Sequence, residues 1–333
     1  MRKNLKQKQE GKRLMRRIFL LSVAFTLVAE AVLVIPILAF TPIGDHFFKS
    51  FAPPATPTPR SSTLGLQAVG AAPIVQARAA YLIDADTGKV LLDVRGSQRL
   101  PMASTAKIMT AILAIETAKL DQTVTIKQDA VNEVNKYKGS SAGLVVGDQM
   151  SLRDLLYGLM LPSGDDAAIA IADAVGGNAS NFVQKMNSYA KQLGLTQTHY
   201  VNPDGLTYLT AQGKPDPNQY SSAGDLARLA RHAMANPFFA QLVQLQHYVL
   251  FPTNFHHAYI WDGINSLLST YPGATGVKTG YTEEAGYCLV FAATNGQHHL
   301  IGALLHDTDD NQRYVDARAL LDWGFGLPVG PTS

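Results

Sequence analysis

The stretch that organises this chain reads STAKIMTAILAIETAKL and runs from Ser104 to Leu120. From Ala106 onward its residues are apolar nearly all round a helical projection, which is typical of a helix buried on every side. A buried helix needs other elements to cover it. The sequence on either side of this stretch indicates what those elements are.

Short apolar runs near both ends of the folded part predict β-hairpins, because each pair flanks a turn signal. The pairs are 80–84 with 90–94 around Asp86-Thr87-Gly88, and 287–293 with 299–305 around the two-residue signal Asn295-Gly296. Between them, residues 152–161 and 167–175 are further helical runs. This order predicts an α+β fold, in which an antiparallel sheet formed by N-terminal and C-terminal strands packs against a helical region.

Composition excludes several classes of protein. The chain has 333 residues, of which 47% are hydrophobic and 16% are charged, which argues against disorder. The single cysteine, Cys288, excludes an intramolecular disulfide and a multi-thiolate zinc site, and we interpret it as a buried residue of an apolar strand. The histidine pairs 256–257 and 298–299 are adjacent rather than spaced as helical metal ligands. We expect no metal and no cofactor.

Positive charge is concentrated at the N-terminus. Residues 1–17 hold eight Lys and Arg residues against one Glu, a local charge of +7 in a chain whose net charge is +2. The 23 residues of 18–40 are apolar except for Ser22, Thr26, Glu30 and Pro36. A run of this length can span a bilayer, and its apolar residues outweigh the cost of about 3 kcal/mol for Glu30.

The positive-inside rule orients this segment. It predicts a cytoplasmic basic tail over 1–17, a transmembrane signal-anchor over 18–40 and a cell-membrane protein whose remaining chain lies on the extracellular side. A cleaved signal peptide is the alternative, but the apolar run exceeds the usual h-region and no A-x-A-like site follows it. A nucleic-acid-binding tail fits poorly with the apolar run that follows, so we expect no nucleic-acid partner.

A spacer and a single domain account for the rest of the chain. Residues 41–75 hold six of the 17 prolines among Ala, Ser and Thr, a composition typical of an extended linker. We expect one folded domain over 76–333.

Three short motifs carry the chemistry. Ser104-Thr105-Ala106-Lys107 places a serine and a lysine at i and i+3, on one face of the buried helix. A serine needs an adjacent base, and desolvation favours a neutral lysine that can act as one. Ser163-Gly164-Asp165 lies in a helix-breaking turn, and Lys278-Thr279-Gly280 precedes the last hairpin. Each motif is common alone; the three in this order resemble the S-x-x-K, S-D-N and K-T-G set of penicillin-recognising serine enzymes.

Flanking residues narrow the resemblance. Four stretches are similar to the D-alanyl-D-alanine carboxypeptidases, the low-molecular-mass penicillin-binding proteins: YLIDADTG at 81–88, LPSGDDA at 161–167, YSSAGDLA at 220–227 and GVKTGYTEEAGY at 276–287. The similarity extends from about residue 76 to Phe325. It implies a β-lactamase/transpeptidase-like fold, peptidoglycan stem peptides ending in D-Ala-D-Ala as substrates, and β-lactam antibiotics as covalent inhibitors.

The resemblance also implies a mechanism. Ser104 would attack the carbonyl between the two terminal D-alanines, with Lys107 as the general base, Ser163 as the proton relay to the leaving amine, and water completing hydrolysis. Removing the terminal D-alanine would limit cross-linking of the cell wall. The oxyanion would lie on the backbone N–H groups of Ser104 and Tyr281. Substrate-binding residues would be Asp165, Lys278, Thr279, Gly280 and Tyr281.

Asp165 departs from the family pattern, which usually has Asn there. A carboxylate only accepts hydrogen bonds, and if ionised near Lys107 it would favour charged lysine and oppose its use as a base. We therefore expect Asp165 either to be protonated or to turn toward Lys278. Asp204 stands where a family loop often has His, which leaves the residues for deacylation open. We interpret Arg313 as a member of a surface ion pair.

Two other functions share the motifs. A class A β-lactamase would need a deacylating glutamate, and no E-x-x-L-N segment lies between the second and third motifs. A catalytically silent penicillin-recognising sensor or scaffold is disfavoured by the intact Ser104 and Lys107 but is kept open by Asp165.

Overall fold

Strands from the two ends of the folded part join in one five-stranded antiparallel sheet. The computed structural model describes residues 64–331, and its strand order is β3-β2-β10-β9-β8. The strands are β2 (Ala79–Asp84), β3 (Val90–Val94), β8 (Ala274–Thr282), β9 (Gly286–Thr294) and β10 (His299–Asp307). The two predicted hairpins are β2–β3 and β9–β10, and β2 pairs with β10 at the centre of the sheet. The predicted α+β arrangement is confirmed.

The β9–β10 turn is longer than its signal indicated. His299 pairs with Thr294, so the loop has the four residues 295–298. The Asn295 side chain accepts the N–H groups of Gln297 and His298, and this capping turn replaces the predicted two-residue one.

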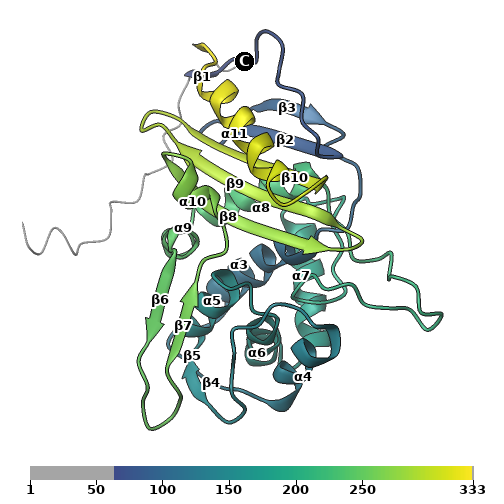
Figure 1. Cartoon of the computed structure of the whole chain (residues 1–333), viewed down its shortest axis with the longest axis vertical. Helices are drawn as coiled ribbons and strands as arrows, with labels where there is room; N and C mark the ends of the chain where they lie inside the picture. The colour runs from purple at the N-terminus through teal and green to yellow at the C-terminus, as the bar shows by residue number, and fades with distance from the viewer. Residues whose placement is uncertain (1–63, 332–333) are drawn as a thin grey trace, which may run out of the picture. The chain divides into compact units, whose positions relative to one another are not determined.

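Both faces of the sheet are buried, and the residues of each strand alternate between two cores. On β9, Leu289 and Phe291 face one core, whereas Cys288 and Val290 face the other. The first core packs against α11 (Gln312–Phe325), which lies over β9 and β10 in Figure 1. The second core joins the sheet to the helical region. Because side chains point to opposite faces in turn, near-continuous apolar strands are what this sandwiched sheet requires.

The helical region surrounds the helix expected from the opening stretch. That helix is α3 (Lys107–Thr117), preceded by the 3-10 turn η1 (Ala103–Ala106), and it is buried from Lys107 to Ala114. Helices α5, α6, α7, α8 and α9 all contact it. The remaining helices are α4 (Gln128–Tyr137), α5 (Leu152–Met160), α6 (Asp165–Gly176), α7 (Ala179–Gln192), α8 (Ala223–Met234), α9 (Pro237–Gln244) and α10 (Leu267–Thr270).

Three two-stranded ladders complete the described part. They are β1 (Leu64–Leu66) with β11 (Val329–Pro331), β4 (Thr123–Thr125) with β5 (Gln149–Ser151), and β6 (His247–Leu250) with β7 (Tyr259–Asp262). Strand β1 falls inside the predicted linker 41–75, so that linker ends earlier than expected. The reason is Leu66, which is fully buried and whose N–H donates to Asp84 at 3.1 Å, a contact that the surrounding composition does not reveal.

The predicted tail 1–17, the anchor 18–40 and the linker up to residue 63 lie outside the described residues. Within residues 64–331, every helix is too short or too polar to cross a bilayer.

Packing of α11 on the sheet gives a test of the fold. Leu320 is fully buried in the core between α11 and the sheet, so Leu320→Ala should lower the free energy of unfolding by about 2–5 kcal/mol. Val315 lies on the same helix and is 47% exposed, and Val315→Ala should change it by less than about 0.5 kcal/mol. Chemical unfolding followed by circular dichroism measures both; equal losses would contradict this packing.

Candidate active site

The serine and lysine of the first motif meet at the start of the buried helix. Ser104 lies in η1 and is partly exposed, whereas Lys107 is the first residue of α3 and is fully buried. Their spacing brings Lys107 Nζ to 2.9 Å from Ser104 Oγ. The expected pairing of the two side chains on one helical face is present.

Three acceptors surround the Lys107 ammonium group. Besides Ser104 Oγ, Nζ lies 2.5 Å from Asp165 Oδ1 and 2.9 Å from the main-chain oxygen of Asp204. A lysine has three N–H donors, so each has a partner. These partners come from η1, from the first residue of α6 and from the loop after residue 200, and they hold the lysine in one position.

Tight backbone packing holds the turn that carries Ser104. Ala103 has a φ of 47°, a conformation that is uncommon for a residue with a Cβ. Gly205 lies against it with a φ of 91°, and a Cβ at Gly205 would come within 1.9 Å of the Ala103 carbonyl oxygen. Gly280 of the third motif packs on the same turn, where a Cβ would lie 3.0 Å from the Ser104 nitrogen.

The second motif forms the turn between α5 and α6, as its helix-breaking residues predicted. Ser163 is buried and has a φ of 65°. Gly164 has room for no side chain, because a Cβ there would lie 2.7 Å from Ala142 and 2.8 Å from the Gly158 carbonyl oxygen. This turn ends at Asp165, whose carboxylate reaches Lys107.

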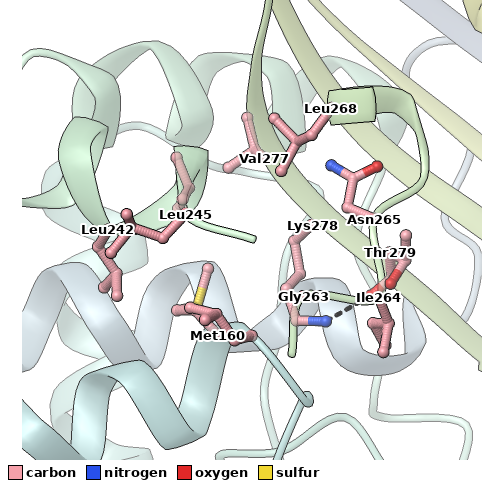
Figure 2. Close-up of a pocket in the computed structure, with 12 residues that line it drawn as sticks. Met160, Leu242, Leu245, Gly263, Ile264, Asn265, Leu268, Val277, Lys278 and Thr279 are labelled. Carbon is pink, nitrogen blue, oxygen red and sulfur yellow. Dashed lines mark hydrogen bonds between the residues drawn. The ribbon is translucent and has the colours of Figure 1, made fainter. Parts of the chain in front are cut away.

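The third motif lies on β8, at the edge of the central sheet. Lys278 and Thr279 are buried, while Tyr281 is 53% exposed. Figure 2 shows the Lys278 side chain beside a cavity of about 10 Å³, where its Nζ donates to the Thr279 carbonyl oxygen at 3.0 Å. Burial lowers the pKa of Lys278 well below that of an ordinary lysine, and the Lys107 ammonium lowers it further.

Asp165 faces Lys107, and the expectation that it turns toward Lys278 was wrong. The reason is its place at the start of α6, directly opposite the start of α3. Burial raises the pKa of Asp165 above that of an ordinary carboxyl, although the Lys107 ammonium acts in the opposite direction. That direction agrees with the other expectation, a carboxyl that takes up a proton readily.

Sequence reasoning missed Asp166, which anchors the loop beside the site. Its buried carboxylate accepts hydrogen bonds from Ser141 Oγ and from the N–H groups of Ala142, Leu144 and Ala167, at 2.8 to 3.1 Å. The only signal in the sequence was an acidic residue in the first turn of a helix, which is common. Three of its hydrogen-bond partners lie in the loop of residues 141–144, which is distant from Asp166 in the sequence, so no local pattern reveals them.

Arg313 was also misinterpreted. Its side chain is only 7% exposed, and Nη1 donates to the carbonyl oxygens of Gly280 and Cys288, both at 3.2 Å. It pairs with Asp310 as well, but its main contacts tie α11 to the strands β8 and β9 at the end of the third motif. Cys288 itself is fully buried, as expected.

A serine beside a buried lysine, at the junction of an antiparallel sheet and a helical region, defines the class of serine acyl-transfer enzymes that use lysine in place of histidine. The profile of the D-alanyl-D-alanine carboxypeptidase family matches residues 67–309. The chain belongs to this family, and the resemblance seen in the motifs, with the serine carboxypeptidase activity that it implies, is confirmed. Among the described residues, no group of three or more His, Cys, Asp or Glu side chains could hold a metal ion.

Individual relatives agree with this assignment. The D-alanyl-D-alanine carboxypeptidase of Streptomyces sp. (strain K15) is 39% identical over 77% of this chain and 89% of its own length. DacF of Bacillus subtilis is 34% identical over 75% of this chain and 62% of its own length. The crystal structure of the Streptomyces K15 DD-transpeptidase has a TM-score of 0.71 at 38% identity and covers 78% of this chain and all of its own. A Mycobacterium tuberculosis D-alanyl-D-alanine carboxypeptidase has a TM-score of 0.70 at 31% identity, covering 79% of this chain and 96% of its own.

The contact of Gly205 with the serine turn gives a second test. Gly205→Ala should strain the backbone and push the Ala103 carbonyl aside, costing about 2 kcal/mol or more and abolishing acylation by a fluorescent penicillin. Gly213 has a similar positive φ of 71° but no atom within 4 Å of the position of its Cβ. Gly213→Ala should cost about 1 kcal/mol and leave acylation unchanged. Equal acylation by both variants would show that Gly205 does not position the serine.

Proposed function

We propose that Ser104 is the nucleophile and Lys107 its general base in removing the terminal D-alanine from peptidoglycan stem peptides. The observation that carries this proposal is the 2.9 Å contact between Lys107 Nζ and Ser104 Oγ. Ser104 is partly exposed, so a substrate can reach it. The serine proton moves to Nζ while Oγ bonds to the carbonyl carbon between the two D-alanines. Lys107 is buried, and its partners hold Nζ beside Ser104 Oγ. The lysine therefore has to lose a proton before it can act as the base, but it does not have to move.

The developing oxyanion is placed between the backbone N–H groups of Ser104 and Tyr281. The close approach of Gly280 to the Ser104 nitrogen supports this position, because it brings β8 next to the nucleophile. Amides held in place by packed backbone stabilise such a charge without having to reorient.

Lys278 and Thr279 are the proposed ligands of the substrate's terminal carboxylate. Lys278 makes one hydrogen bond, to the carbonyl oxygen of its neighbour, so an ammonium at this position keeps donors for a substrate. Burial lowers the pKa of Lys278, and a substrate carboxylate acts in the opposite direction, because a nearby anion favours the charged amine. A charged donor bound to a carboxylate makes a strong, directional contact.

Ser163 completes the cycle by passing the proton from Lys107 to the leaving amine, so that the C–N bond breaks and D-alanine departs. Water then attacks the acyl-enzyme and regenerates Ser104. Trimmed stem peptides have lost the D-alanine whose bond drives cross-linking, so this reaction limits cross-linking of the wall.

Release of D-alanine tests the assignment. The full chain incubated with a peptide ending in D-Ala-D-Ala should release free D-alanine, and Ser104→Ala should release none while keeping its unfolding midpoint. Penicillin labelling should be lost in the same variant. Rapid penicillin hydrolysis by the unaltered chain would favour a β-lactamase, whereas labelling without any D-alanine release would favour a sensor.

We further propose that the chain is a single-pass membrane protein with its catalytic domain outside the cell. The support comes from residues 1–40, where a segment of charge +7 precedes 23 largely apolar residues. An anionic cytoplasmic leaflet attracts such a basic tail. The linker after residue 40 then gives the domain reach into the wall.

Fractionation of cells tests this location. The full chain should sediment with membranes and resist extraction by salt, and its domain should be cleaved by protease added to intact spheroplasts. A chain that begins at residue 41 should lose the membrane association and keep its penicillin labelling. Recovery of the full chain in the soluble fraction would exclude the anchor.

A further inference from the structure

The contact between Asp165 and Lys107 has a chemical consequence for the base. Lys107 is fully buried and Asp165 is 1% exposed, and 2.5 Å separates Nζ from Oδ1. The other oxygen, Oδ2, is buried and has no hydrogen-bond partner among the described residues. The only hydrogen-bond donor to this carboxyl's side-chain oxygens is therefore the lysine that must act as the base.

An ionised aspartate would keep that lysine charged, and a charged lysine cannot accept a proton from Ser104. Transfer of one proton from Nζ to Oδ1 resolves the conflict, because it converts a buried ion pair into two neutral groups. The ions attract each other, but each has lost its hydration, so a neutral pair is favoured by burial much more than it would be in water.

We propose that Asp165 accepts a proton from Lys107 and so produces the neutral amine that deprotonates Ser104. The proposal rests on the roles assigned above to Ser104 and Lys107. In the sequence of steps, a proton passes from Nζ to Oδ1, the Oγ proton then passes to Nζ, and the Oγ–C bond forms as the carbonyl electron pair moves to oxygen. Asp165 acts through Lys107 and does not touch the substrate.

The groups around Asp165 support this role. Five charged or titratable side chains interact electrostatically with Asp165 from four helices or strands and one loop: Lys107 on α3, Glu133 on α4, Asp166 on α6, Lys278 on β8 and Asp204 in the loop after residue 200. Burial has the largest influence on the pKa of Asp165, and the pKa is raised although Lys107 acts in the opposite direction, which makes this carboxyl a better proton acceptor than an ordinary aspartate.

The two neighbouring aspartates cannot take its place. Asp204 is fully buried, and burial together with the nearby charge of Asp165 raises its pKa well above the ordinary value. Its Oδ1 accepts the N–H of Leu206 at 2.8 Å, so the contact of Asp204 with Lys107 is made by its main-chain oxygen and not by its carboxyl group. Asp166 points its oxygens at the loop that it anchors, and four donors already occupy them. Of the three carboxyl groups, that of Asp165 is the one that hydrogen-bonds to Lys107 Nζ.

The pH dependence of acylation distinguishes this role from a structural one. The Lys107–Asp165 pair works when it holds a single proton, so activity falls at acidic pH only as the carboxyl becomes protonated while the amine stays charged. With Asn at position 165, the lysine must lose its proton to solvent first. The acidic limb of the pH profile, which is the fall in acylation rate toward low pH, then reflects the protonation of an amine. An ammonium group titrates at higher pH than a carboxyl.

The experiment measures the second-order rate of acylation of the full chain by a fluorescent penicillin between about pH 4.5 and 9. In Asp165→Asn, the acidic limb should move upward by at least about one pH unit, with a tenfold or greater loss of rate below it. The family usually has Asn here, so this variant should fold, and its unfolding midpoint checks that it does. Asp166→Asn makes the same charge change one residue away and should slow acylation without moving the limb upward.

Two outcomes overturn the proposal while leaving the proposed function intact: an acidic limb that stays in place in Asp165→Asn, or faster acylation by that variant at acidic pH. Failure of the proposed function has another signature, since the unaltered chain would then be acylated at no pH, or Ser104→Ala would be acylated equally well. The pH profile of D-alanine release should show the same shift as the penicillin reaction.

Discussion

The burial of one ammonium group constrains the whole catalytic half of this protein. Lys107 begins a helix that is covered on all sides, so its charge has no access to water and depends on acceptors supplied by the fold. A serine hydroxyl, a carboxylate and a main-chain carbonyl provide them. An unpaired charge in such a place costs several kcal/mol, so the start of α6 and the loop of Asp204 must lie close to Lys107.

Local patterns accounted for the parts of the fold that local interactions determine. Short apolar runs and turn signals predict strands β2, β3, β9 and β10, because each hairpin forms between neighbouring segments. The spacing within the first motif likewise predicts that Ser104 and Lys107 share a helical face. The joint order of three motifs indicated the penicillin-recognising serine enzymes, which no single motif could do, and the flanking stretches narrowed the resemblance to the family.

Features that depend on distant contacts could not be predicted in this way. The Asp204 carbonyl is a main-chain group, and no side-chain pattern reveals that it binds Lys107. Arg313 reads as a surface residue until α11 packs on the sheet and buries it against β8 and β9. Strand β1 is three residues long and is recognisable only through its partner at the other end of the described chain. The direction in which Asp165 turns is set by the meeting of α3 and α6.

The β1–β11 ladder has a mechanical consequence. Any pull transmitted along the residues before Leu64 enters the domain through a ladder only three residues long, supported by the bond from Leu66 to Asp84. The ladder includes neither η1, which carries Ser104, nor the start of α6. The pulling force therefore acts first on the β1–β11 pairing and on β2. Because this ladder is separate from the five-stranded sheet, its pairing can open under tension without breaking a hydrogen bond between the strands of that sheet.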